Sequence, residues 1–125
     1  MSVLIDSDIV IEVLRARNQA MIAQWSALAS SNSTVFVSPV TFAEVGAGAF
    51  DHEFEMIAQL LAPLACVPID EKIGKLAGQY LRRYGKSHGI KIADALIAAS
   101  ASQSGAVLWT RNRKHYPMPD LSFYA

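Results

Sequence analysis

The sequence predicts an α/β fold in which helices cover both faces of a mainly parallel sheet. Short apolar segments typical of buried strands alternate with longer segments of helical spacing along the whole chain. No repeat, linker or low-complexity stretch interrupts this alternation. We therefore expect a three-layer α/β/α sandwich with four to five strands, built as a single domain over residues 1–125.

The elements of the first half follow from local patterns. "SVLID" is an apolar run that ends in an acid and predicts a strand near 2–6. "SDIVIEVLRAR" and "NQAMIAQWSALASS" carry apolar stripes at helical spacing. "STVFVS" predicts a strand near 34–38, and "SPVTFAEVGAGAF" a helix with Ser38 as its N-cap and Pro39 in its first position.

The second half continues the alternation. "HEFEMIAQLLAPL" predicts an amphipathic helix that stops at Pro63, and "ACVPI" predicts a strand near 65–69. "DEKIGKLAGQYLRRYGKS" is a helix that begins acidic and ends basic, as the helix dipole favours. A helix over 91–105 ends at Gly105. "AVLWT" predicts a strand near 107–110, and "LSFYA" a short last one.

Composition excludes several classes of protein. The chain is 52% hydrophobic but has no apolar run of the ~20 residues that cross a bilayer, so we expect no membrane association. Its first residues carry acids where a signal peptide carries bases, which favours a cytoplasmic location. One cysteine cannot form an intrachain disulfide.

Charge is unevenly distributed although the net charge is zero. Residues 1–71 hold nine acids and two bases, and residues 72–125 hold nine bases and two acids. An acidic pocket beside a basic rim would attract a divalent metal and a polyanion. Solvated helix faces that differ in charge explain the same pattern equally well.

Four acids lie where a parallel sheet gathers its ligands, beyond the carboxyl ends of strands. Asp6 and Asp8 follow the first strand, and either could simply cap the first helix. Glu44 could complete a capping box with Thr41. The Ser38 helix start puts Glu44 in the second turn instead, among apolar neighbours, where we expect a mostly buried face. A buried carboxylate needs a cation or a proton.

Asp94 raises the same question at the start of the 91–105 helix. It sits among apolar residues and could cap that helix, although nearby residues offer other starts. Three or four carboxylates that converge on one sheet edge match the oxygen ligands that Mg²⁺ or Mn²⁺ prefers. Such a metal supports phosphodiester hydrolysis by activating water and neutralising charge on the phosphate.

Four blocks in order, "LIDSDIVIEVL", "SPVTFAEV", "IADALIAA" and "LWTRNRKHYPM", resemble the PIN domain, in particular the VapC-type toxin ribonucleases of toxin–antitoxin pairs. The resemblance covers nearly the whole chain. It implies a PIN-like α/β/α sandwich and an Mg²⁺- or Mn²⁺-dependent endoribonuclease that cleaves RNA and blocks translation. It also implies a homodimer and a small, DNA-binding antitoxin that inhibits the enzyme. Carried over, the site acids are Asp6, Glu44 and Asp94.

The sequence departs from that family at one position. Many members carry a fourth acid after the strand-four threonine, where this chain has Asn112, with His115 further on. Asn112 offers an oxygen or a hydrogen bond but no charge, which favours one tightly held ion, with Asp8 as partial compensation. His115 could contact a phosphate or transfer a proton, or it could be a loop histidine packed against Tyr116.

The roles can be divided by position. We expect Asp6 and Asp94 to ligate the metal directly, and Glu44 to reach it through a water that it orients for attack. Asn112 would position a further water. We expect Ser7 and Thr110 to form hydrogen bonds to the acids or to water. We expect three basic residues to contact the RNA backbone: Arg111, Arg113 and Lys114.

Two other classes of protein compete with the nuclease. A phosphotransfer receiver domain would use Asp6 and Asp8 as its acid pair and Asp70 as phosphoacceptor, but Glu44 and Asp94 would then have no role. The residues after Asp70 also look like a helix start. A PIN domain that binds RNA or protein without catalysis is the third hypothesis, because the fourth acid is missing.

Overall fold

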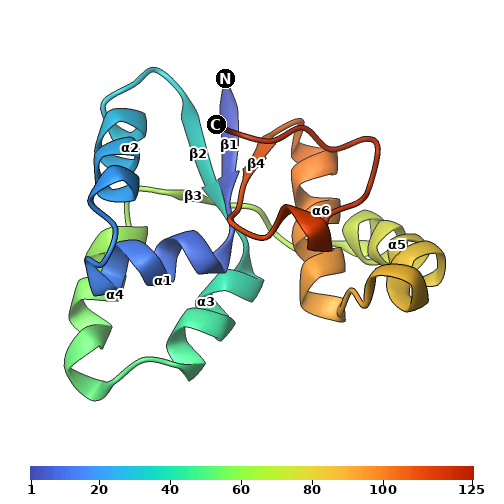
Figure 1. Ribbon diagram of the computed structural model, residues 1–125, viewed down its shortest axis with the longest axis horizontal. Coiled ribbons are helices and arrows are strands. Elements are labelled where there is room, and N and C mark those ends of the chain that lie inside the picture. The colour runs from blue at the N-terminus through green and yellow to red at the C-terminus, as the bar shows by residue number, and fades with distance from the viewer.

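The computed structural model describes residues 1–125 and contains a four-stranded parallel sheet in the order β3-β2-β1-β4. Figure 1 shows the sheet between two helical layers, which gives the expected three-layer α/β/α sandwich. The elements run β1 (Ser2–Ile5), α1 (Ser7–Arg15), α2 (Gln19–Ala29), β2 (Thr34–Val37), α3 (Pro39–Ala47), η1 (Asp51–Glu53), α4 (Phe54–Leu61), β3 (Ala65–Cys66), α5 (Glu71–His88), α6 (Ile92–Ser104), β4 (Val107–Trp109) and η2 (Arg113–His115).

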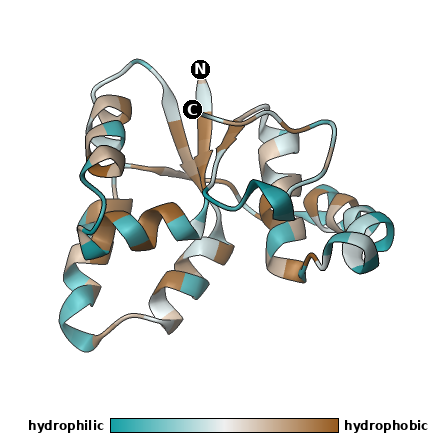
Figure 2. Cartoon of the chain, viewed as in Figure 1, coloured by the Kyte–Doolittle hydropathy of each residue, from teal (hydrophilic) through white to brown (hydrophobic).

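The strands send alternate side chains to the two faces, as the period of two requires. In β1, Val3 and Ile5 join a core with α1, α2 and α4, whereas Leu4 joins a second core with α5 and α6. Leu108 and Trp109 divide in the same way in β4. Figure 2 shows hydrophobic residues in the central strands and on parts of the surrounding helices, and the turn after β4 as strongly hydrophilic.

Local sequence explains most element boundaries. Ser38 accepts a hydrogen bond from the Val40 N–H at the start of α3, with Pro39 in the first turn, as expected. Gly105 ends α6 in the left-handed conformation at φ 67°, which glycine adopts without strain. No helix combines the length and the apolar character that crossing a membrane requires.

Two predicted strands differ from the observed ones. β3 stops at Cys66 instead of running to 69, because Pro68 has no N–H to donate to a sheet. The last segment forms a single parallel bridge between Phe123 and Leu108 and no full strand. Two backbone hydrogen bonds, from Leu108 to Ser122 and from Tyr124 to Leu108, hold it beside β4.

Candidate active site

A polar cavity of about 210 Å³ opens at the carboxyl end of the sheet. It is lined by Asp6, Ser7, Asp8, Ile11, Glu44, Asp94 and Asn112. Every residue predicted as catalytic or metal-binding therefore lies around this one cavity. Ser7 also lines it, as expected for a supporting residue.

The chain topology explains why these residues meet. Successive connections move from β1 to β2 and β3, and then the chain crosses back so that β4 lies on the other side of β1. In open parallel sheets, ligands bind at such a switch point, outside the carboxyl ends of the strands. Asp6 follows β1 and donates its backbone N–H to the Trp109 carbonyl at 2.9 Å. The ends of β1 and β4 are thus joined directly under the cavity.

Asp6 is buried, with 7% of its surface exposed. Its Oδ1 accepts a hydrogen bond from the Ser7 N–H at 2.8 Å, which also caps α1. Its Oδ2 accepts from the hydroxyls of Thr110 at 2.8 Å and Tyr116 at 2.9 Å. Burial, and then the nearby charge of Asp8, raises the pKa of Asp6 to about 6 against these hydrogen bonds. Burial therefore raises the pKa of Asp6 more than repulsion from Asp8 does.

Asp8 lies in the first turn of α1 and faces the turn after β4. Its Oδ2 accepts the Arg111 N–H at 3.0 Å, and burial raises the pKa of its carboxyl. Its Oδ1 is buried and has no hydrogen-bond partner. A buried carboxylate oxygen without a donor is costly, and a cation would relieve that cost.

Glu44 corrects one expectation. It lies on the exposed side of α3, not on a mostly buried face, because the buried positions of this helix are Thr41 and Val45. Its carboxylate is nevertheless fixed, since the Ser7 hydroxyl donates to Oε1 at 2.6 Å. The same Ser7 oxygen lies 3.0 Å from Thr41 Oγ1. A buried pair of hydroxyls thus anchors an exposed carboxylate at the cavity.

Asp94 and Asn112 also line the cavity, and His115 lies beside both of them. Asp94 Oδ2 accepts the Lys91 N–H at 3.1 Å, so Asp94 does cap the start of α6, and it still lines the cavity. The Asn112 side-chain nitrogen lies 2.8 Å from His115 Nδ1, which is 3.8 Å from Asp94 Oδ2. His115 therefore contacts two residues that line the cavity but does not line it itself, and the sequence had left its role open.

The basic residues after β4 differ in how freely they can meet a ligand. The Arg111 side chain is held by Glu12, which lies 3.0 Å away and also binds Arg17 at 2.7 Å. The Arg113 guanidinium lies over the Phe123 ring at 4.9 Å from its centroid. Lys114 is exposed. Of the three residues predicted to hold RNA, Arg111 is thus already ion-paired within the chain.

The residues around the cavity suit Mg²⁺ or Mn²⁺ by their chemistry. The donors are carboxylate, amide and hydroxyl oxygens, which are the ligands of hard cations, and Asp8 Oδ1 is a buried oxygen without a partner. No three His, Cys, Asp or Glu side chains are grouped closely enough to hold an ion as they stand. The assignment of Asp6, Asp8, Glu44 and Asp94 to a metal therefore stays a prediction.

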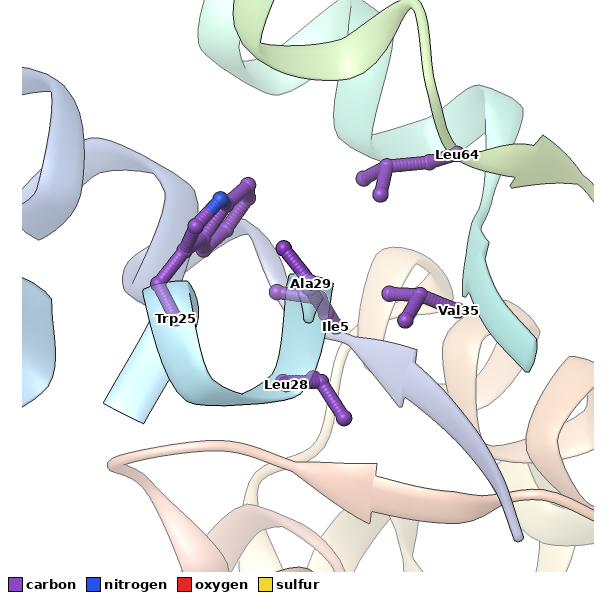
Figure 3. A pocket seen from close by; sticks show the side chains of 6 residues that line it. All are labelled: Ile5, Trp25, Leu28, Ala29, Val35 and Leu64. Carbon is purple, nitrogen blue, oxygen red and sulfur yellow. The ribbon is translucent and has the colours of Figure 1, made fainter. Parts of the chain in front are cut away.

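Two other features do not form sites. A small apolar cavity of about 20 Å³ lies between α2 and the sheet, and Figure 3 shows that only hydrocarbon side chains and Trp25 line it. Asp70 accepts the Ile73 N–H at 3.0 Å as the N-cap of α5 and does not line the acidic cavity. The receiver-domain hypothesis, which needs Asp70 as phosphoacceptor, therefore gains no support.

Tyr116 and Thr41 are the polar residues around these acids that sequence reasoning missed. Tyr116 reads as a core aromatic, and only the fold brings its hydroxyl to Asp6. Thr41 lies at a buried helix position, where its hydroxyl must find a partner. For Thr41 the one signal available was a polar atom within an otherwise apolar pattern, whereas Tyr116 follows a basic polar run that gave no such signal.

The fold and the cavity define the class of protein: a parallel α/β/α sandwich with an acidic site at the switch point of its sheet. A family model of the PIN domain matches residues 3–121. The chain therefore belongs to the PIN-domain family.

Individual relatives agree with this assignment over nearly the whole chain. Ribonuclease VapC10 of Mycobacterium tuberculosis is 36% identical over 117 residues, which cover 93% of this chain and 86% of the relative. Ribonuclease VapC19 of the same species is 32% identical over 120 residues, which cover 94% of this chain and 95% of the relative. A solved structure of VapBC-1 from nontypeable Haemophilus influenzae is 25% identical and has a TM-score of 0.78. The match covers 99% of this chain and 97% of that one.

Proposed function

We propose that the protein is an Mg²⁺- or Mn²⁺-dependent endoribonuclease that acts as the toxin of a toxin–antitoxin pair, cleaving RNA and blocking translation. The observation that carries this proposal is the acidic cavity at the carboxyl edge of the sheet, lined by Asp6, Asp8, Glu44, Asp94 and Asn112. The names of the relatives VapC10 and VapC19, both ribonucleases, support the substrate class.

Asp6 and Asp94 are the proposed direct ligands, with Asp8 beside them. A bound Mg²⁺ or Mn²⁺ would supply an activated water and neutralise charge on the scissile phosphate. Asp6 is suited to ligation because it follows a strand directly and hydrogen bonds fix both of its oxygens. Asp8 Oδ1 is suited because no protein donor occupies it.

Glu44 is the proposed group that orients the attacking water. It is exposed, so it can exchange protons with solvent, and the Ser7 hydroxyl holds one of its oxygens at 2.6 Å. A carboxylate that a hydrogen bond holds beside the cavity is suited to orient a water for attack. Asn112, which lines the same cavity and whose amide contacts His115, would position a further water.

The turn after β4 is the proposed contact to the RNA backbone. Arg113 and Lys114 are exposed there and have no carboxylate partner within salt-bridge distance. Arg111 contributes less direct binding, because Glu12 already pairs with its guanidinium. Such contacts position a nucleic acid without reading its bases.

A small DNA-binding antitoxin is the proposed inhibitor, and a homodimer the proposed form of the toxin. The resemblance to VapC-type toxins supports both. The proposed location is the cytoplasm. Co-expression with the product of a small adjacent gene should yield a stable complex, and light scattering of the free protein should give twice the chain mass.

The central test is RNA cleavage by the purified protein without its antitoxin. Cleavage should vanish in EDTA and return on addition of Mg²⁺ or Mn²⁺ in excess. Cleavage that persists in EDTA would contradict the metal-dependent mechanism. RNA binding without cleavage, at any metal concentration, would favour the non-catalytic PIN domain that the missing fourth acid keeps open.

A further inference from the structure

Tyr116 connects the acidic cavity to the core between the sheet and α5 and α6. Only 3% of its surface is exposed, and its ring packs in the core that includes Leu108 and Met118. Its hydroxyl donates to Asp6 Oδ2 at 2.9 Å. The ring is therefore held by packing at one end, and its polar end is fixed on a carboxylate of the site.

The hydrogen bonds divide the two oxygens of Asp6 into unequal roles. A carboxylate accepts about four hydrogen bonds, two on each oxygen. Oδ2 receives two, from Tyr116 and Thr110, and Oδ1 receives one, from the Ser7 N–H. Thr110 has a single hydroxyl proton, and the 2.8 Å contact with Asp6 is much shorter than its 3.5 Å contact with Asp8. Oδ2 is thus filled, and Oδ1 keeps one position open.

We propose that Tyr116 is a positioning residue of the nuclease site, which with Thr110 immobilises Asp6 and leaves Oδ1 as its free ligand atom. This inference rests on the proposed function, because it assumes that Asp6 binds a cation. Hydrogen bonds that fix the orientation of a metal ligand typically change metal affinity by about 10–100-fold when they are lost. Tyr116 contacts no substrate in this role and acts only through Asp6.

A purely structural explanation exists and predicts a different result. A buried tyrosine hydroxyl needs a partner, and Asp6 could serve merely to satisfy it. The chain contains a matched case in Tyr80, which is also buried and donates to an aspartate, Asp120, that also accepts from a serine hydroxyl. Asp120 does not line the acidic cavity, so Tyr80 is a control for the loss of a buried hydroxyl alone.

The experiment compares Tyr116→Phe with Tyr80→Phe and the parent in the full chain. Mn²⁺ binding is measured by calorimetry, and RNA cleavage is measured as a function of Mn²⁺ and of RNA concentration. Tyr116→Phe should raise the Mn²⁺ dissociation constant about 10-fold and shift the Mn²⁺ dependence of cleavage equally. Excess Mn²⁺ should restore most of the rate, with the KM for RNA unchanged. Tyr80→Phe should lower the thermal midpoint but leave the Mn²⁺ dissociation constant within about 2-fold of the parent.

Each outcome is decisive because binding and cleavage are measured separately. A Tyr116→Phe variant that binds Mn²⁺ like the parent overturns this inference and leaves the proposed function intact. Equal loss of Mn²⁺ affinity in both tyrosine variants also overturns it, because a general loosening of the fold would then be the cause. A folded parent that neither binds Mn²⁺ nor cleaves RNA overturns the proposed function and this inference together.

Discussion

Two aspartates of this protein accept hydrogen bonds from the same kinds of side chain, but their pKa values are shifted in opposite directions. Asp6 Oδ2 accepts from Tyr116 and Thr110, and Asp120 Oδ2 accepts from Tyr80 and Ser102. Burial and the charge of Asp8 raise the pKa of Asp6 to about 6. Asp120 is exposed, and its two hydrogen bonds lower its pKa despite some burial.

The comparison shows that the surroundings of each carboxylate, and not the number of hydrogen-bond donors, determine the direction of its pKa shift. Both have a tyrosine and a hydroxyl side chain as donors, so these bonds alone cannot explain opposite shifts. Asp6 is removed from water and lies near another acid, whereas Asp120 is solvated. Asp120 links the C-terminal segment to α5 and α6 by hydrogen bonds. Asp6 lines a cavity, and its surroundings disfavour the charged form of its carboxylate.

The largest expected effect is the loss of cleavage when Asp6 is neutralised. Asp6→Asn keeps the size of the side chain but removes the charge that would hold the cation. It should reduce RNA cleavage by more than about 1,000-fold, because both metal binding and water activation fail. Steady-state cleavage of a labelled RNA at saturating Mg²⁺ measures this effect.

Asp120→Asn is the matched control for that comparison. It has nearly the same hydrogen-bond partners at an exposed position, so cleavage should stay within about 2-fold of the parent. If Asp6→Asn cleaves RNA as fast as Asp120→Asn, the nuclease assignment is wrong for this chain, and the non-catalytic PIN domain should replace it.

Glu44 tests whether an exposed carboxylate can be required for RNA cleavage. It is exposed like Asp120, yet it lines the cavity and is held by Ser7. Glu44→Gln should lower the cleavage rate by about 100-fold, as for a lost general base, while Mn²⁺ binding by calorimetry persists in weakened form. Complete loss of Mn²⁺ binding would make Glu44 a direct ligand instead.

The pH dependence of stability should have opposite signs at the two aspartates. The folded-state pKa of Asp6 lies above the ordinary 3.8 at about 6, so its favourable contribution is full below pH 4 and is lost as pH rises through 6. In chelator, the parent should lose about 2 kcal/mol relative to Asp6→Asn between pH 4 and 7. The pKa of Asp120 is lowered, so its contribution is present above pH 4 and is lost on acidification.

Urea unfolding at several pH values measures both contributions. The free energy of unfolding of Asp120→Asn should lie below that of the parent at pH 7 and approach it in acid. If the parent instead gains stability relative to Asp6→Asn as pH rises from 4 to 7 without metal, the folded-state pKa of Asp6 is not raised.

The smallest expected effect separates two arginines that both lie over aromatic rings. The Arg113 guanidinium lies over Phe123 beside the site, and that of Arg83 lies over Tyr84 on α5. Arg113→Ala should weaken RNA binding by a few fold and reduce its salt dependence by about one counterion, with the cleavage sites unchanged. Arg83→Ala should not change RNA binding. Equal effects of both substitutions, measured by filter binding at several salt concentrations, would extend the RNA surface to α5.

The sequence predicted the parallel sheet and the positions of most of its strands because strand ends and helix starts are local signals. Asp6, Asp8 and Asp94 could each be placed at a strand end or helix start, and parallel topology then brings such positions to one edge. The same local signals could not predict burial. Glu44 was expected on a buried face from its apolar neighbours, yet two of those neighbours, Phe42 and Ala43, are themselves exposed.

The remaining features depend on contacts between distant segments. Tyr116 lies 110 positions from Asp6, and Glu12 reaches across to Arg111 from another element. Nothing in the sequence near either residue indicates its partner. For the same reason, the pairing of His115 with Asn112 and Asp94 left its role open until the fold was known.

The single bridge between Phe123 and Leu108 also has a consequence for handling the protein. β4 is the last strand of the sheet, and residues 122–124 occupy the hydrogen-bonding groups of Leu108 that would otherwise face outward. An uncovered strand edge is a template for pairing with another chain, and thus for aggregation. Truncation before Ser122 should therefore reduce the soluble yield even though it leaves every residue of the cavity in place.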